Sequence, residues 1–205
     1  MYYGEKFNAV THVVGTVLAL LGATVLVVLA AMEGDPWKVS SVAIYGVTLV
    51  SLYSISGLYH SLRGRPKNIL RELDHQSIYL LIAGSYTPFC LVTLRGPWGW
   101  SLLGVVWGLA LLGGLQELWT RSGARILSVL IYVLMGWCIV VAMVPLVKNL
   151  PTGGVAWLMT GGVLYTGGIV FYAFDEKLKH GHGIWHLFVL AGSISHYISI
   201  VVYLV

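Results

Sequence analysis

The stretch His182-Gly183-Ile184-Trp185-His186 opens the last long apolar run of the chain, which continues to Val205 without an Asp, Glu, Lys or Arg. Such a run meets the roughly 20 apolar residues that a helix needs to cross a membrane. Two histidines four positions apart lie one above the other on the same face of a helix. Both imidazoles can then reach one metal ion, as in other helical zinc motifs. The stretch therefore predicts a membrane-spanning helix that begins with part of a metal site.

The rest of the chain has the same character. Of its 205 residues, 58% are hydrophobic and 10% are charged, and the mean hydropathy is +0.83; a soluble domain carries about 25% charged residues. We predict an all-α integral membrane protein in which residues 1–205 form a single domain of seven transmembrane helices. The seven stretches without Asp, Glu, Lys or Arg are Val10–Met32, Val39–Leu62, His75–Leu94, Gly96–Gln116, Ile126–Val147, Pro151–Phe174 and Gly183–Val205.

The basic residues predict how these helices are oriented. If the N-terminus is cytoplasmic, nine of the twelve Lys and Arg residues fall on the cytoplasmic side: Lys6, Arg63, Arg65, Lys67, Arg71, Arg121, Arg125, Lys177 and Lys179. The outer loops then hold Lys38, Arg95 and Lys148. Because basic residues concentrate in cytoplasmic loops, we expect the N-terminus inside and the C-terminus outside. The net charge of +4 reports this orientation, and we expect no nucleic-acid partner.

This topology brings separate histidines to one depth. His60 lies at the cytoplasmic end of the second helix, and His182 and His186 lie at the cytoplasmic start of the seventh. Three neutral imidazoles with one open position form a catalytic zinc arrangement. We therefore predict zinc as the cofactor, with His60, His182 and His186 as its ligands.

Two further residues are predicted to act beside the metal. Asp74 lies at the cytoplasmic start of the third helix, at the depth of the histidines, where it could hold or deprotonate a water molecule. Ser56 precedes His60 by four residues, so its hydroxyl faces the same way and could orient that water or a ligand. Asp74 and Ser56 are the predicted catalytic residues.

Each residue also has a plainer interpretation. A histidine near a helix end can simply lie in the wet headgroup region, Asp74 can be a helix N-cap, and Ser56 can be a small residue between packed helices. His180 could replace His182, because the segment reads His-x-His-x-x-x-His. Three histidines and an acid at one level favour the metal site, since polar groups in membrane spans are costly and usually functional.

The motifs, taken together, resemble a known family. They are Glu5-x-x-Asn8-x-x-Thr11-His12, Ser56-x-x-x-His60, Asp74-His75 and His182-x-x-x-His186. In this order they look like the hemolysin III family of bacterial membrane proteins, which belongs with the adiponectin and progestin receptors (the PAQR superfamily). The resemblance implies a seven-helix bundle in the bacterial inner membrane. It also implies zinc held by His60, His182 and His186, with Asp74 near a water at the metal, and kinship with membrane hydrolases such as alkaline ceramidases.

Three functions remain open at this point. The first is a zinc-dependent intramembrane hydrolase of a lipid amide or ester, which takes a fatty-acyl chain from the membrane lipids into the bundle interior. The second is a non-enzymatic sensor or receptor of lipid or membrane state, in which zinc only holds helices together. The third is a pore-forming haemolysin, which the absence of a charged stripe along the spans disfavours.

Overall fold

A computed structural model describes residues 4–120, 125–175 and 177–205. The regular structure in these ranges is entirely helical. Its α-helices are α1 (Lys6–Glu33), α2 (Pro36–Ser61), α3 (Arg65–Pro88), α4 (Pro97–Thr120), α5 (Arg125–Trp137), α6 (Met143–Asn149), α7 (Thr152–Ala173) and α8 (Gly181–Tyr203). Two short segments of other helix types join them: the π-helical turn η1 (Phe89–Thr93) and the 3₁₀ turn η2 (Cys138–Ala142).

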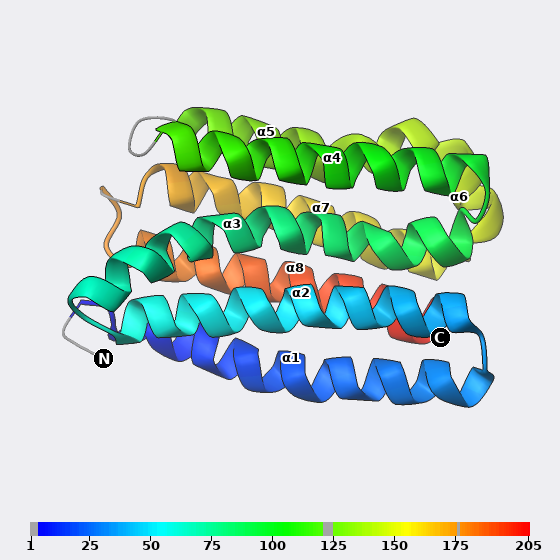
Figure 1. The fold of residues 1–205 in the computed structure, drawn as a ribbon, viewed down its shortest axis with the longest axis horizontal. Coiled ribbons are helices and arrows are strands. Elements are labelled where there is room, and N and C mark those ends of the chain that lie inside the picture. Colours follow the sequence, from blue (N-terminus) through cyan, green and yellow to red (C-terminus); the bar gives the residue numbers. More distant parts are fainter. Residues whose placement is uncertain (1–3, 121–124, 176) are drawn as a thin grey trace.

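Within the described residues the helices form seven rods that lie side by side (Figure 1), because α5, η2 and α6 follow one another as a single interrupted rod. Six rods are long and apolar enough to cross a membrane. The exception is α3, whose first turns carry Arg65, Lys67 and Arg71. The predicted multi-pass helical bundle is thus confirmed, with six candidate spans in place of the predicted seven, and α3 packs between α2 and α4.

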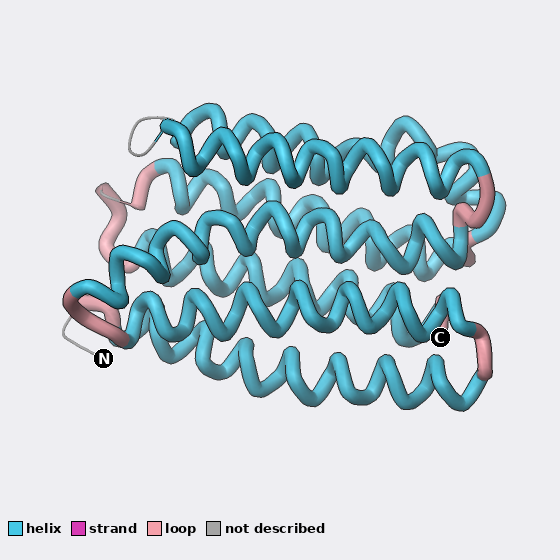
Figure 2. Tube along the Cα trace, in the orientation of Figure 1, coloured by secondary structure: helices cyan, strands magenta, loops and turns pink. Residues whose placement is uncertain are grey.

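The loops alternate between the two ends of the bundle, as Figure 2 shows, so α1 begins and α8 ends at opposite ends. Each helix packs against its neighbours in the chain, and α1 also packs against α8. The first and last helices therefore close the bundle. This contact places the N-terminal turns of α1 beside those of α8, where two of the predicted metal ligands lie.

The third helix begins earlier than the sequence predicted. It starts at Arg65 rather than at Asp74, after Gly64, which has a φ of 72°, and with Pro66 in its first turn. Glycine adopts positive φ readily, and proline suits the first turn because the amide hydrogen that it lacks would have no partner there. Asp74 consequently lies in the third turn of α3, and the interpretation of Asp74 as an N-cap is wrong.

Two prolines interrupt the regular α-helices. Pro88 ends α3, and the π-helical turn η1 follows it directly. Pro145 lies in the first turn of α6, immediately after the 3₁₀ turn η2. Because proline has no amide hydrogen, an α-helix cannot continue through it with its full set of hydrogen bonds.

The outward faces of the bundle are apolar. On α1, for example, Val17 is 53% exposed, Leu21 is 63% exposed and Met32 is 79% exposed. Contiguous exposed apolar surface of this kind marks a membrane or partner interface rather than a surface in water. Together with the six candidate spans, it establishes a multi-pass membrane protein.

Glycines let α1 approach its neighbours closely at the end where it begins. A Cβ on Gly57 of α2 would lie 3.3 Å from the Val13 side chain, and a Cβ on Gly183 of α8 would lie 2.2 Å from the Phe7 ring. Small residues allow such close contacts between membrane helices. The start of α1 is thereby held between the last turns of α2 and the first turns of α8.

Candidate metal centre

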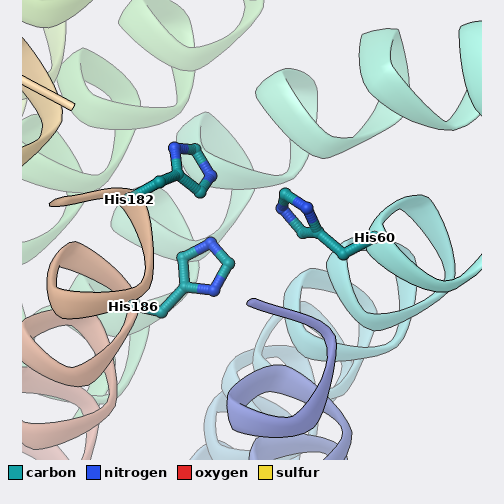
Figure 3. A group of neighbouring side chains, drawn as sticks. All are labelled: His60, His182 and His186. Atoms are coloured by element: carbon teal, nitrogen blue, oxygen red, sulfur yellow. The ribbon is translucent and has the colours of Figure 1, made fainter. Parts of the chain in front are cut away.

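Three histidines converge at the end of the bundle where α1 begins. His60 comes from the last turn of α2, and His182 and His186 come from the first two turns of α8. Figure 3 shows their rings facing a common space between the two helices. One ring nitrogen of each lies within 4.8 Å of those of the other two. The four-residue spacing on α8 stacks His182 and His186 on one face, as the sequence predicted.

A separate group holds the Nδ1 atom of each ring. The Nδ1 of His60 lies 2.6 Å from the Oε2 of Glu5, and the Nδ1 of His182 lies 2.9 Å from the Oδ2 of Asp175. The Nδ1 of His186 lies 3.2 Å from the Thr11 hydroxyl. A carboxylate only accepts hydrogen bonds, so the Nδ1 atoms of His60 and His182 carry the hydrogen, and each Nε2 keeps its lone pair.

The Nε2 atoms of the three histidines indicate which kind of ligand the site could bind. Those of His60, His182 and His186 are all buried and have no hydrogen-bond partner among the described residues. A buried polar atom without a partner is costly, and three that share one space indicate a common ligand. Metal-binding histidines typically donate their other N–H to a carboxylate, as His60 and His182 do. The residues therefore fit a metal ion, and an all-imidazole set with a carboxylate nearby suits zinc.

Glu5 belongs to a wider network at this site. Besides His60, its carboxylate accepts hydrogen bonds from Lys67, at 3.0 Å, and from Asn8, at 3.1 Å. Partial burial alone would raise the pKa of Glu5, but the hydrogen bonds from His60, Lys67 and Asn8 outweigh it and lower the pKa to about 2. Glu5 is thus an ionised carboxylate next to His60 that also pairs with the ammonium group of Lys67.

The two predicted catalytic residues lie beside the histidines. Asp74 is 7% exposed and Ser56 is 2% exposed, and both line the same internal cavity. The Ser56 hydroxyl interacts with the Asp74 carboxyl, which also lies within electrostatic range of His182. Asp74 and Ser56 thus place a carboxyl and a hydroxyl in the cavity that His12, stacked on His186, also lines.

The cavity extends away from the site along the helices. On α3 its lining residues recur from Asp74 through Ile78 and Ile82 to Tyr86. Four positions of this spacing mark one face of a helix, and twelve residues advance about 18 Å. Apart from the polar groups at its two ends, most side chains that line the cavity are apolar. The cavity therefore runs as a mostly apolar path along α3 from Asp74 toward Tyr86.

His12 is the main addition to the predicted site. Its ring stacks on that of His186, with centroids 3.6 Å apart and planes 15° apart, and it lines the cavity. Both of its ring nitrogens are buried without a partner among the described residues. From the sequence, His12 appeared only as part of a motif. Its helix is the first of the chain and that of His186 is the last, so spacing alone did not bring the two residues together. The spacing Glu5, Asn8, Thr11 and His12 on one helix face was the available signal.

The remaining histidines lie outside the group of three. His75 pairs with Glu117 on α4, with 2.8 Å between Nδ1 and Oε1. His180 precedes α8 with a positive φ of 63°, so the metal group contains His182 and not His180. His196 lies ten residues beyond His186 on α8. The two carboxylates that hold histidine Nδ1 atoms, Glu5 and Asp175, were not predicted as such. Glu5 lies 55 positions from His60 in the sequence, and Asp175 lies in the loop before α8.

Comparison with known proteins agrees with these features. A family model described as haemolysin-III related matches residues 2–197. The chain belongs to the haemolysin-III-related family. The resemblance predicted from the four motifs is thereby confirmed.

Members of the haemolysin-III-related family and of a mammalian group match almost the whole chain. Hemolysin-3 of Bacillus cereus is 42% identical over 97% of this chain and 91% of its own length. The Hemolysin-3 homolog of Bacillus subtilis (strain 168) is 40% identical over 98% of this chain and 94% of its own length. The monocyte to macrophage differentiation factor of Homo sapiens is 29% identical, over 98% of this chain and 85% of its own length.

Proposed function

We propose that this haemolysin-III-related protein is a zinc-dependent hydrolase that cleaves an amide or ester bond of a membrane lipid. One observation carries the proposal: three buried, unpartnered histidine nitrogens come together, and His12, whose ring stacks on that of His186, lines an apolar cavity together with Asp74 and Ser56. A structural zinc site is normally closed by a fourth protein ligand. Here the protein supplies three nitrogens, and the side toward the cavity carries a carboxyl and a hydroxyl.

The protein groups divide the reaction between them. Zinc bound by His60, His182 and His186 would polarise the lipid carbonyl and acidify water, toward a pKa of about 7. Asp74 accepts a proton from the attacking water as the water oxygen bonds to the carbonyl carbon. Asp74 then gives that proton to the leaving amine or alkoxide as the carbon–nitrogen or carbon–oxygen bond breaks.

The neighbouring groups position the substrate. The Ser56 hydroxyl, which interacts with the Asp74 carboxyl and lines the same cavity, would hold that carboxyl in place. His12 is buried beside His186 with an unpartnered N–H that can donate to the lipid carbonyl. The apolar lining between α3, α5 and α7 receives the acyl chain and excludes bulk water from the reacting end.

We further propose that the site faces the cytoplasm in the cell membrane. The histidines lie at the end where α1 begins, and nine of the twelve basic residues fall in segments at that end when the N-terminus is inside. This asymmetry favours a cytoplasmic N-terminus. A periplasmic reporter enzyme fused after Val205 should be active, whereas activity of a cytoplasmic reporter at that position would reverse the orientation.

A second candidate function rests on a different observation. The three histidines and their anchors join α1, α2, α8 and the loop before α8 through Glu5, Thr11 and Asp175. A metal ion here would lock the two ends of the chain together. A lipid or membrane-state sensor with a structural zinc would have the same contacts and would not need Asp74 for its function.

The experiment that tests the hydrolase is an assay of purified protein. Metal analysis should find one zinc per chain, and incubation with a panel of ceramides and phospholipids should release free fatty acid. Protein stripped of zinc by a chelator should release none until zinc is restored. Release that survives complete removal of the metal would contradict the proposal.

A further inference from the structure

The far end of the cavity holds a polar group that the proposed reaction does not use. His196 is 9% exposed and lines the cavity together with Ser85, Tyr86 and Tyr165. It lies ten residues after His186 on α8, which is about 15 Å along the helix axis. An apolar cavity that needed only to hold a hydrocarbon chain would have no use for an imidazole at this depth.

The one hydrogen bond that His196 makes among the described residues shows which of its ring nitrogens is left without a partner. Its Nε2 lies 3.2 Å from the carbonyl oxygen of Leu158. A carbonyl only accepts, so Nε2 carries the hydrogen and Nδ1 has a lone pair. That Nδ1 is buried and has no partner among the described residues.

Packing holds the ring in this orientation. A Cβ on Gly161 of α7 would lie 2.1 Å from the Cδ2 of His196 and 2.4 Å from its Nε2. The Cδ2–Nε2 edge therefore presses against α7, and Nδ1 lies on the other edge of the ring. Tyr165 contacts the ring edge-on, with centroids 5.3 Å apart.

The neighbouring polar groups are satisfied. The Tyr86 hydroxyl donates to the carbonyl oxygens of Met135 and Gly136 and accepts from the amide of Ile139. The Ser85 hydroxyl donates to the carbonyl oxygen of Ile82. Of the polar side chains named at this end, His196 is the one that the described residues leave with a buried atom, Nδ1, that has no hydrogen-bond partner.

We propose that the far end of the cavity is a polar subsite that binds a hydroxyl group on the acyl chain of the lipid. The hydroxyl donates a hydrogen bond to the Nδ1 of His196 while the chain's carbonyl lies at the three histidines. An extended chain advances about 1.2 Å per bond, so about 15 Å corresponds to roughly 12 bonds. The inference rests on the proposed function for the placement of the carbonyl, and it names the substrate class as mid-chain hydroxylated acyl lipids.

Binding of free fatty acids tests this subsite without turnover. We expect 12-hydroxystearic acid to displace radiolabelled stearic acid from the purified protein at about tenfold lower concentration than unlabelled stearic acid does, the factor for a hydrogen bond to a buried group that is otherwise unpaired. Equal potency of the two acids would overturn the proposal and would indicate that only a water molecule occupies the Nδ1 position. Failure of both acids to bind would also overturn it.

Two matched substitutions assign the preference to the Nδ1 atom. His196→Gln can keep the donor near Leu158 but loses the acceptor at the Nδ1 position, and it should abolish the tenfold preference. His196→Asn keeps an acceptor close to that position and should retain part of it. Gly161→Ala, which pushes the ring off α7, should reduce the preference with the imidazole still present. A preference unchanged in His196→Gln would overturn the proposal.

The same proteins separate this proposal from the hydrolase. Zinc content and thermal stability of each variant show whether the fold and the metal site persist. Preferential binding of the hydroxylated acid without fatty-acid release from any lipid would leave the subsite standing and remove the hydrolase. Normal fatty-acid release with equal binding of the two fatty acids would leave the hydrolase standing and remove the subsite.

Discussion

The Oε2 of Glu5 lies 2.6 Å from the Nδ1 of His60, although 55 positions of sequence separate the two residues. Glu5 precedes α1, and His60 lies in the last turn of α2, so the contact joins the two helices at the metal site. The carboxylate fixes the ring with its Nε2 toward His182 and His186. A carboxylate outside the group of three histidines thus orients one member of that group.

Glu5→Gln should weaken zinc binding while leaving the bundle folded. The amide cannot supply the negative charge that favours the metal, and loss of such an anchoring partner typically costs about 10–100-fold in metal affinity. The measurement is competition with a chelator of known zinc affinity. Glu33→Gln is the matched control, since Glu33 pairs with Lys38 at the opposite end of the bundle. Equal zinc affinities of wild type and Glu5→Gln would refute this role.

The three histidines should be individually necessary for stoichiometric zinc. Replacing His60, His182 or His186 by Ala removes one of three nitrogen ligands, and metal analysis of the purified protein should show well under one zinc per chain. His75→Ala and His196→Ala should retain full zinc, because neither residue belongs to the group. A triple variant of the three ligands that kept one zinc per chain would show that the site lies elsewhere.

Gly183→Ala should disturb the site through packing alone. The added Cβ would lie 2.2 Å from the Phe7 ring and 2.9 Å from the Oδ1 of Asn8, so α1 must move away from α8. Overpacking typically costs about 1–3 kcal/mol, and the shift should draw Thr11 away from His186 and lower zinc affinity. The checks are the melting temperature and the chelator competition.

Gly104→Ala serves as the control for that change. A Cβ on Gly104 meets nothing within 4 Å, and alanine is better than glycine in a helix by up to about 1 kcal/mol. Its melting temperature should therefore stay the same or rise. A drop of equal size in both variants would mean that the close contact between α1 and α8 is not what matters.

The sequence was sufficient to predict the helical bundle and the grouping of the three histidines, for a topological reason. Alternating spans bring every second helix end to one side, so His60, His182 and His186 had to share a depth. Spacing also placed Ser56 above His60. These inferences need only helix periodicity and the number of spans.

The anchors and the start of α3 could not be predicted in the same way. Glu5 and Asp175 find their histidines through the packing of α1 and the path of the loop before α8, which no periodicity encodes. Charged residues mark where a membrane span ends but not where a helix ends, so α3 begins at Arg65 rather than at Asp74. His12 joined the site only once α1 was seen to pack against α8.

The most direct test of the proposed hydrolase is fatty-acid release by Asp74→Asn measured beside its zinc content. Asparagine is nearly isosteric with aspartate, so the fold and one zinc per chain should persist. Asparagine cannot accept the proton of the attacking water, and loss of a general base costs about 10²–10⁴-fold in rate. We predict full zinc with release reduced by at least about 100-fold. Equal release from wild type and Asp74→Asn, or none from wild type across ceramides and phospholipids, would contradict the hydrolase and favour a sensor with a structural zinc.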